Sequence, residues 1–272
     1  MRVPRVPADA AAFTAIILAA QRAGSLDPLA EAANVTHKCL APIDGRPLIA
    51  HVVKALARVP GLARIRVCTE RAAFEAFRAE LGRSPDWSGP IDYVPAADNL
   101  ADSIYAAAEG VEGPLLITTA DNVLLTPAAV AAVLAAHARG AEVVLAMTTR
   151  DRVLAAHPEG QRRFYRLSDD SYSNCNLYGL SGGRALKAAE SFRSGGQFAK
   201  NPARLALMLG PLTLMMARLG LISLTTAMRR ISKRLGARVE AVILEDGSHA
   251  IDVDNERTYA IAKLLLERRR AA

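Results

Sequence analysis

The sequence predicts an α/β fold with three layers, in which helices pack on both sides of a mainly parallel, mixed sheet in a Rossmann-like arrangement. Two observations predict it. Strand-like and helix-like segments alternate almost without interruption through residues 13–150. The 272 residues are 51% hydrophobic, which is enough for one large core. Because no repeat or low-complexity linker divides the chain, we expect a single domain over 1–272, with a regular half (13–150) and an elaborated half (151–272).

The regular half begins with an apolar, β-branched run at 13–20, which predicts a buried strand. A helical pattern follows at 45–59, with Pro47 in the first turn. Thr126 and Gly140 favour the start and the end of a later helix. The remaining elements expected in this half are strands at 64–70, 91–96, 113–121 and 141–149, and helices at 71–82, 99–111 and 126–140.

The elaborated half lacks this alternation. Residues 163–182 are polar with aromatics at short intervals, which is typical of antiparallel strands or a lid. The apolar stretch 200–236 predicts two or three amphipathic helices, with breaks near Gly210–Pro211 and Gly220. The closing elements are a strand at 238–246 and a helix at 255–270, capped by Asp254 or Asn255.

The composition excludes several classes of protein. The net charge of +7 suits nucleic acid or small anionic substrates, but the Arg clusters do not alternate with aromatics, so we expect no nucleic acid partner. The three Cys residues are far apart and form no CxxC, which argues against a zinc site or a disulfide framework. The first residues lack the apolar core of a secretory signal, and no apolar run reaches the ~20 residues of a membrane span. We therefore expect a cytoplasmic protein.

Two strand ends carry polar residues. The strand in "AIILAAQRAG" ends at Gln21–Arg22, and the strand in "LLITTADN" ends at Asp121. In a parallel sheet both ends reach the same edge, where ligands bind. The first loop, with Arg22, Gly24 and Lys38, could cradle a triphosphate, or it could be a surface loop with ordinary cations.

Three carboxylates could hold a magnesium ion. Asp121 offers the hard oxygen ligand that Mg²⁺ prefers, unless it only caps the next turn. Asp252 and Asp254 stand at alternate positions in "AIDVDNERTYAIA", so both could point to the same edge. If Asp254 caps the closing helix, Asp252 is available to complete the cation site with Asp121.

Taken in order, "KCLAPIDGRPLI", "NLADSIYAAAEG", "LLITTADNVLLTP" and "AIDVDNERTYAIA" resemble the MobA-like and sugar-1-phosphate nucleotidyltransferases, which have the nucleotide-diphospho-sugar transferase fold. The resemblance covers most of the chain and is weak over 150–236. It implies an Mg²⁺-dependent reaction in which an NTP and a phosphorylated sugar, polyol, inositol or cofactor precursor give the NDP-linked acceptor and pyrophosphate. The base and the acceptor stay open.

The resemblance also implies roles for individual residues. The half 13–150 would bind the nucleotide, and the half 151–272 would bind the acceptor, unless 163–182 is only a polar edge hairpin. The implied catalytic residues are Arg22, Lys38 and Asp121; the nucleotide-binding residues are Ala19, Ala20, Gln21, Gly24, Asn99 and Ser103; the acceptor-binding residues are Arg166, Asn174 and Asn176; and the metal ligands are Asp121 with Asp252 or Asp254.

The first loop departs from the family pattern, because Gln21 stands where the first glycine is expected and Gly24 comes late. Glycine allows a close approach of the backbone to phosphate, which Gln does not readily allow. Either the loop has another shape, or the nucleotide binds differently, or catalysis is lost. The alternatives are a non-catalytic nucleotide-binding protein, or a nucleotide-sugar glycosyltransferase, although the latter would favour a DxD where this chain has "ADN".

The stretch 200–236 is longer than a nucleotidyltransferase needs. It could pack on the sheet, form the face of a homodimer, or lie on a membrane surface. The last hypothesis rests on Arg229, Arg230, Lys233 and Arg234, which lie beside apolar residues and could contact anionic lipid.

Overall fold

The computed structural model describes residues 12–21, 27–192 and 219–271, together with residues 210, 213, 215 and 216. Parts of the sequence-based predictions lie outside the described residues: Arg22, Gly24 and, within the stretch 200–236, residues 200–209, 211 (the Pro of the predicted break at Gly210–Pro211), 212, 214, 217 and 218.

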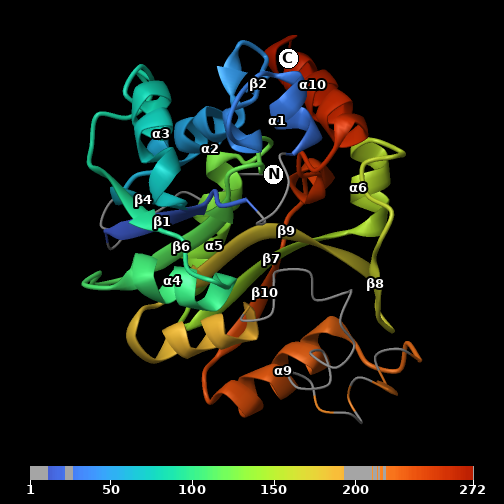
Figure 1. Cartoon of the computed structure of the whole chain (residues 1–272). Coiled ribbons are helices and arrows are strands. Elements are labelled where there is room, and N and C mark those ends of the chain that lie inside the picture. Colours follow the sequence, from blue (N-terminus) through green and yellow to red (C-terminus); the bar gives the residue numbers. More distant parts are fainter. Residues whose placement is uncertain are drawn as a thin grey trace.

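A central sheet of eight strands organises the fold, in the order β10-β7-β9-β6-β1-β4-β5, with β8 paired to β9 (Figure 1). The pairs of β1 with β4 and β6, of β4 with β5, and of β7 with β10 are parallel, whereas β9 is antiparallel to its neighbours. The mainly parallel, mixed sheet is therefore confirmed. The strands are β1 (Phe13–Leu18), β4 (Leu62–Thr69), β5 (Ile91–Pro95), β6 (Leu115–Thr119), β7 (Val143–Thr149), β8 (Tyr165–Arg166), β9 (Ser171–Leu180) and β10 (Val239–Ile243), with β2 (Pro42–Ile43) and β3 (Arg46–Pro47) in a separate small sheet.

Helices cover both faces of this sheet. The α-helices in the described parts of the chain are α1 (Pro28–Ala32), α2 (Leu48–Ala57), α3 (Phe74–Leu81), α4 (Leu100–Ala108), α5 (Pro127–Ala138), α6 (Arg150–Ala156), α9 (Leu224–Leu235) and α10 (Glu256–Ala271). The 3₁₀ helices are η1 (Lys38–Leu40), η2 (Arg71–Ala73), η3 (Gly183–Phe192) and η5 (Gly247–Ala250).

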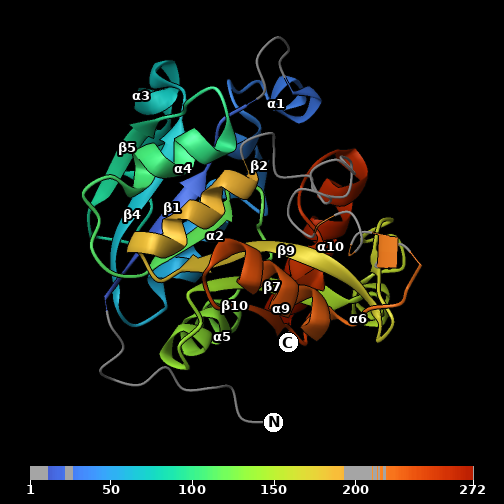
Figure 2. The ribbon, with the colours of Figure 1, turned by 90° about the horizontal axis from the view of Figure 1, so that it is seen from below.

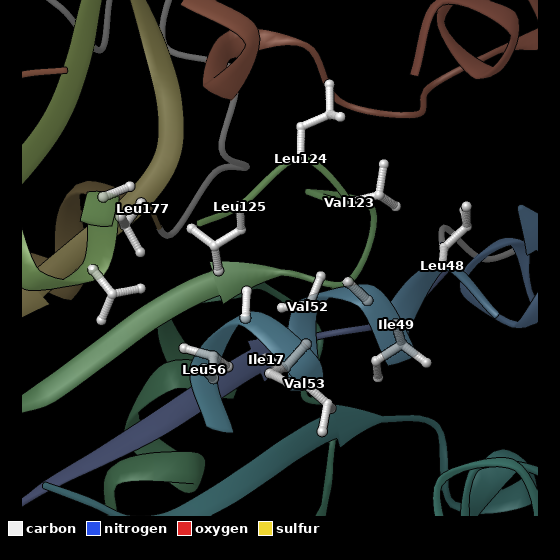
Figure 3. Close-up of a cluster of buried hydrophobic side chains, with 14 of the residues drawn as sticks. Ile17, Leu48, Ile49, Val52, Val53, Leu56, Val123, Leu124, Leu125 and Leu177 are labelled. Carbon is white, nitrogen blue, oxygen red and sulfur yellow. The ribbon is translucent and has the colours of Figure 1, made fainter. Parts of the chain in front are cut away.

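The alternation of side chains along β1 separates the two cores. Ile17 belongs to the larger cluster, with Val52 of α2 and Leu125 of the loop after β6 (Figure 3). Ile16 belongs to the cluster on the opposite face, which includes Ile104 of α4 and Ile231 of α9. Figure 2 shows α4 and α9 in front of the strands on this second face. Two apolar faces on one strand explain why its sequence is an uninterrupted apolar run.

Strand β9 differs from the expectation for 163–182. It forms an antiparallel strand, as one alternative predicted, but it lies between β6 and β7 in the middle of the sheet rather than in a lid or an edge hairpin. Tyr172, Cys175 and Leu177 are buried on this strand. The burial of these side chains favours a position inside the sheet, although the strand also carries polar residues. The β7–β9 register shifts after Leu145, and Asn176 there has a φ of 46°.

The ends of the helices correct one prediction and decide between two alternatives in another. Pro47 precedes α2 as its N-cap and pairs in β3, so it is not in the first turn. Asn255, rather than Asp254, caps α10, because its Oδ1 accepts a hydrogen bond from Thr258 N at 3.2 Å. Thr126 caps α5 as predicted, through Ala129 N, and Gly140 follows that helix with a φ of 90°.

The stretch 200–236 contains one α-helix among its described residues that spans several turns, α9, which begins after Ser223. Gly220 has a φ of 65° and lies in a turn, as the sequence predicted. No helix in the described parts of the chain combines the length and the apolar character needed to cross a bilayer.

Candidate functional site

The ends of neighbouring strands bring the candidate residues together. β1 and β6 are parallel, with Leu18 opposite Thr119, so the loops after both strands begin at the same edge of the sheet. The segment between η5 and α10 joins this edge, because Val253 N donates to Asp121 O at 3.1 Å. The common edge predicted for the two loops is therefore observed.

Lys38 lies among the carboxylates at this edge. Its Nζ is 2.6 Å from Asp121 Oδ2 and 3.5 Å from Asp254 Oδ1. The Lys38 and Asp121 side chains are only 18% and 17% exposed. Burial lowers the pKa of Lys38, but the Asp121 carboxylate and its hydrogen bond outweigh burial and raise the pKa overall. The ammonium therefore stays charged and offsets part of the negative charge.

Asp252 completes the group of carboxylates. Its Oδ2 accepts a hydrogen bond from Asn176 Nδ2 at 2.6 Å. Burial raises the pKa of Asp252 well above its ordinary value, and the nearby Asp121 and Asp254 carboxylates add to the effect. One lysine therefore faces three carboxylates, and the site has excess negative charge whenever all three are ionised.

Two carboxylate oxygens at this site have no donor. Asp121 Oδ1 and Asp252 Oδ1 are buried and accept no hydrogen bond. A buried acceptor without a partner is unfavourable, and a divalent cation would satisfy both oxygens. Among the described residues, no three His, Cys, Asp or Glu side chains form a ready metal-binding group. Mg²⁺ needs only one or two carboxylates when substrate phosphates supply further oxygens, so the residues present fit it.

Two asparagines of β9 connect to Asp252. Asn174 Nδ2 donates to Asn176 Oδ1 at 2.9 Å and also to the Tyr178 hydroxyl. Asn174 Oδ1 is buried and has no donor. The left-handed backbone at Asn176 aims its amide across to Asp252. Hydrogen bonds thus connect Asp252 with both asparagines that were predicted to bind the acceptor.

The loop after β1 is held by a carboxylate at the end of β4. Glu70 Oε1 accepts a hydrogen bond from Gln21 N at 2.8 Å, and Glu70 Oε2 accepts one from His37 Nε2 at 3.1 Å. The Gln21 side chain donates to Thr36 O at 2.8 Å. Burial raises the pKa of Glu70, but hydrogen bonds from its own and the Gln21 backbone N–H outweigh burial and lower the pKa. Gln21 therefore connects this loop with the segment that precedes Lys38.

Other predicted residues have local partners. Asn99 caps α4 through Asp102 N at 3.0 Å, and Ser103 Oγ accepts from Ala97 N at 2.9 Å. Ala19 is buried and donates to Cys68 O, whereas Ala20 is exposed. Arg166 is exposed on β8 opposite Ser171, and no contact joins it to the carboxylates in the described structure.

Sequence reasoning missed Glu70 and His37. A signal for Glu70 was present, because this carboxylate follows the apolar strand in "RIRVCTE" as Asp121 follows its own strand. His37 had no signal in the sequence. Its role depends on the approach of two segments 33 residues apart.

Comparisons with known proteins show the family and the fold of the chain. The family model described as the MobA-like NTP transferase domain matches residues 15–206. A structure described as a hypothetical transferase from Thermus thermophilus shares 27% identity, with a TM-score of 0.71 over 92% of this chain and 99% of that one. No curated protein matches significantly in sequence.

Two further structures share the fold at low identity. The 4-diphosphocytidyl-2C-methyl-D-erythritol synthase from Anaerococcus prevotii is 11% identical, with a TM-score of 0.59 over 96% of this chain and 98% of that one. A CMP:2-keto-3-deoxy-manno-octonic acid synthetase in complex with CTP is 14% identical, with a TM-score of 0.57 over 95% and 100%. Because the family model covers well over half of its residues, the chain belongs to the MobA-like NTP transferase family and is a nucleotidyltransferase.

Proposed function

We propose that the chain transfers a nucleotidyl group from an NTP to a phosphorylated small-molecule acceptor, releases pyrophosphate, and depends on Mg²⁺. One observation carries the proposal: the two donor-free, buried oxygens of Asp121 and Asp252 lie in a cluster whose only described cation is Lys38. Two buried carboxyl oxygens without donors, in a group with a single ammonium, suit a substrate that arrives with a divalent cation.

Each residue then has a physical task. Asp121 and Asp252 would hold the Mg²⁺, and Asn176 fixes the orientation of Asp252 through a hydrogen bond to its Oδ2. When bound there, Mg²⁺ would offset the charge of the triphosphate and of the leaving pyrophosphate. Lys38 adds an ammonium group beside the same phosphates, and alignment of two anions for in-line attack requires no covalent enzyme intermediate.

The remaining assignments extend this proposal. The half 13–150 binds the nucleotide, with the loop Ala19–Gln21 beside the triphosphate and Arg22 and Gly24 following it in sequence. The half 151–272 binds the acceptor, which meets Asn174 through its donor-free Oδ1. Arg166, Asn99 and Ser103 stay predictions, as does the third carboxylate, Asp254, as a direct metal ligand.

A screen for pyrophosphate release tests the reaction. Each of the four NTPs is offered with Mg²⁺ against a panel of sugar, polyol, inositol and cofactor-precursor phosphates. The isosteric variant Asp121→Asn should lose release by at least about 100-fold, because it weakens both the metal site and the Lys38 ion pair. Asp151→Asn, an exposed carboxylate on α6, is the matched control and should keep the full rate.

The outcomes separate the proposal from its alternatives. Release with one NTP and one acceptor class, lost in Asp121→Asn alone, supports it and identifies both substrates. If an NTP raises the melting temperature but no pair releases pyrophosphate, the proposed reaction is contradicted in favour of a binding protein. Equal rates for Asp121→Asn and wild type would remove the carboxylate site from the mechanism.

A further inference from the structure

The positive charge of this protein is concentrated in one segment. Residues 191–239 contain nine Lys and Arg residues and no Asp or Glu. Of the 34 basic and 27 acidic residues in the chain, 25 basic and all 27 acidic residues lie elsewhere. The net charge of +7 therefore arises from this segment, while the rest of the chain is slightly negative. A distribution of this kind indicates a surface for an anionic partner rather than general attraction of substrates.

Helix α9 displays part of this charge. Leu224, Ala227 and Ile231 are buried against the sheet, and the opposite face exposes Arg229 and Lys233, which are four residues apart. Arg234 is exposed beside Lys233. None of these three cations has a carboxylate partner in the described structure. They are therefore available to an external anion.

Exposed apolar side chains accompany these cations. In the described structure, four large apolar side chains are exposed, and three of them are Met215 (53%), Leu219 (63%) and Leu221 (61%). Arg230 links α9 to the residues beside Met215. Its Nη1 donates to Thr213 Oγ1 at 2.7 Å and contacts Met216 Sδ at 3.7 Å. The basic-apolar surface consists of Met215, Leu219, Leu221, Arg229, Lys233 and Arg234.

We propose that the basic-apolar surface docks the protein on an anionic lipid surface. Apolar side chains flanked by unpaired cations are the combination that interfacial segments use, since the apolar groups enter the lipid and the cations meet its headgroups. A nucleic acid would use the cations but leave the apolar side chains in water, and this surface has no aromatic ring on which bases could stack. A homodimer formed through this surface would place the cations of the second copy near the same cations of the first, and their repulsion disfavours it.

Cosedimentation of the full chain with vesicles tests the proposal without any turnover. We expect binding to vesicles of phosphatidylcholine with phosphatidylglycerol, little binding to phosphatidylcholine alone, and release by high salt. Each cation near an anionic surface strengthens binding about fivefold, so Arg229→Gln/Lys233→Gln/Arg234→Gln should weaken it on the order of 100-fold. Leu219→Ser/Leu221→Ser should also weaken it, at least about tenfold.

Matched variants control for charge and for apolar exposure in general. Arg58→Gln/Lys263→Gln/Arg268→Gln removes three exposed cations from α10 and the end of α2, and Leu264→Ser removes the other exposed apolar side chain. Both controls should bind like wild type. Circular dichroism confirms that each variant is folded before its binding is compared.

Three outcomes would overturn the proposal. The first is no cosedimentation with anionic vesicles at low salt. The second is an equal loss of vesicle binding in the α9 triple variant and in the triple control variant. The third is a dimer in light scattering that Leu219→Ser/Leu221→Ser dissociates. Binding of single-stranded homopolymers that depends on the three cations but not on the leucines would assign the surface to nucleic acid instead. Because vesicle binding needs no substrate, its failure leaves the proposed reaction untouched, and the reverse also holds.

Discussion

At the residue scale, Lys38 occupies the middle of the carboxylate group, where its ammonium is 2.6 Å from Asp121 and 3.5 Å from Asp254. We expect Lys38→Met to lower the stability of the metal-free protein by about 2 kcal/mol, because buried carboxylates lose their cation. Mg²⁺ should restore much of that loss, since the vacated position favours a cation. The melting temperature measured in EDTA and in Mg²⁺ checks this.

Lys54→Met on α2 controls for the loss of a lysine, because Lys54 has no carboxylate partner in the described structure and its variant should melt alike in EDTA and in Mg²⁺. Lys38→Met should also reduce turnover at least about 100-fold, because its charge is missing beside the phosphates. A variant that melts like wild type in EDTA would show that Lys38 does not stabilise the carboxylate group.

Asn176 has a positioning role in the proposed site, because its amide donates to Asp252 Oδ2, and its predicted contact with the acceptor stays a prediction. Asn176→Gly keeps the backbone free to adopt a φ of 46° and removes the amide that donates to Asp252 and accepts from Asn174. The loss of such a supporting hydrogen bond typically weakens metal binding about 10- to 100-fold. We expect that loss in Mn²⁺ affinity measured by electron paramagnetic resonance. Asn255→Gly, at the cap of α10, is the control for the same substitution at another asparagine; an unchanged affinity in Asn176→Gly would refute the assignment.

The sequence predicted the charged members of this site and missed their partners. Asp121, Asp252 and Asp254 were identified because carboxylates that follow a strand are conspicuous in sequence, and Lys38 because it is a cation of the first loop, which could cradle a triphosphate. The link from Asn176 to Asp252 depends on the insertion of β9 beside β6, which side-chain periodicity does not reveal. The charged residues of a site are therefore easier to identify from sequence than the residues that orient them.

At the element scale, Glu70 joins the end of β4 to the loop after β1. Because hydrogen bonds lower its folded-state pKa below the ordinary 4.5, the unfolded chain takes up the proton first as the pH falls. The stabilisation from Glu70 is thus present above about pH 4.5 and is lost as the pH falls through the lowered, folded-state pKa. We expect Glu70→Gln to be about 1 kcal/mol less stable than wild type at pH 7 and nearly equal to it at acid pH, by urea unfolding.

Glu75→Gln is the control for this prediction, because Glu75 is 83% exposed and its ion-pair partner among the described residues is Arg78 on its own helix. Its effect on stability should be small at every pH, as is usual for an exposed ion pair. A stability difference for Glu70→Gln that does not change with pH would mean that the hydrogen bonds, and not the charge, account for the role of Glu70.

The elements of 13–150 followed the sequence closely because the inner strands β1 and β6 are almost fully buried and give uninterrupted apolar runs, and helices such as α5 have a recognisable N-cap. Short elements were not predicted: α1 has five residues and η1 has three, too few for a periodic pattern. The position of β9 was also missed, since order within a sheet depends on pairing between distant segments.

At the scale of the whole molecule, the charge distribution separates two tasks. Outside 191–239 the chain has 25 basic and 27 acidic residues, so attraction of anionic substrates depends on local cations such as Lys38 and not on the net charge. We therefore expect Arg229→Gln/Lys233→Gln/Arg234→Gln to keep kcat/KM for nucleotidyl transfer within about twofold of wild type at low salt and at about 0.2 M salt, where charges beyond the Debye length are screened.

The measurement uses the substrate pair from the pyrophosphate screen, in solution and without vesicles, and compares the triple variant with Lys38→Met. A triple variant that loses vesicle binding and keeps kcat/KM shows that the basic-apolar surface and the carboxylate site act independently. A parallel fall in both quantities would contradict this separation, because it would mean that the charge of 191–239 also steers anionic substrates to the edge of the sheet where Asp121 lies.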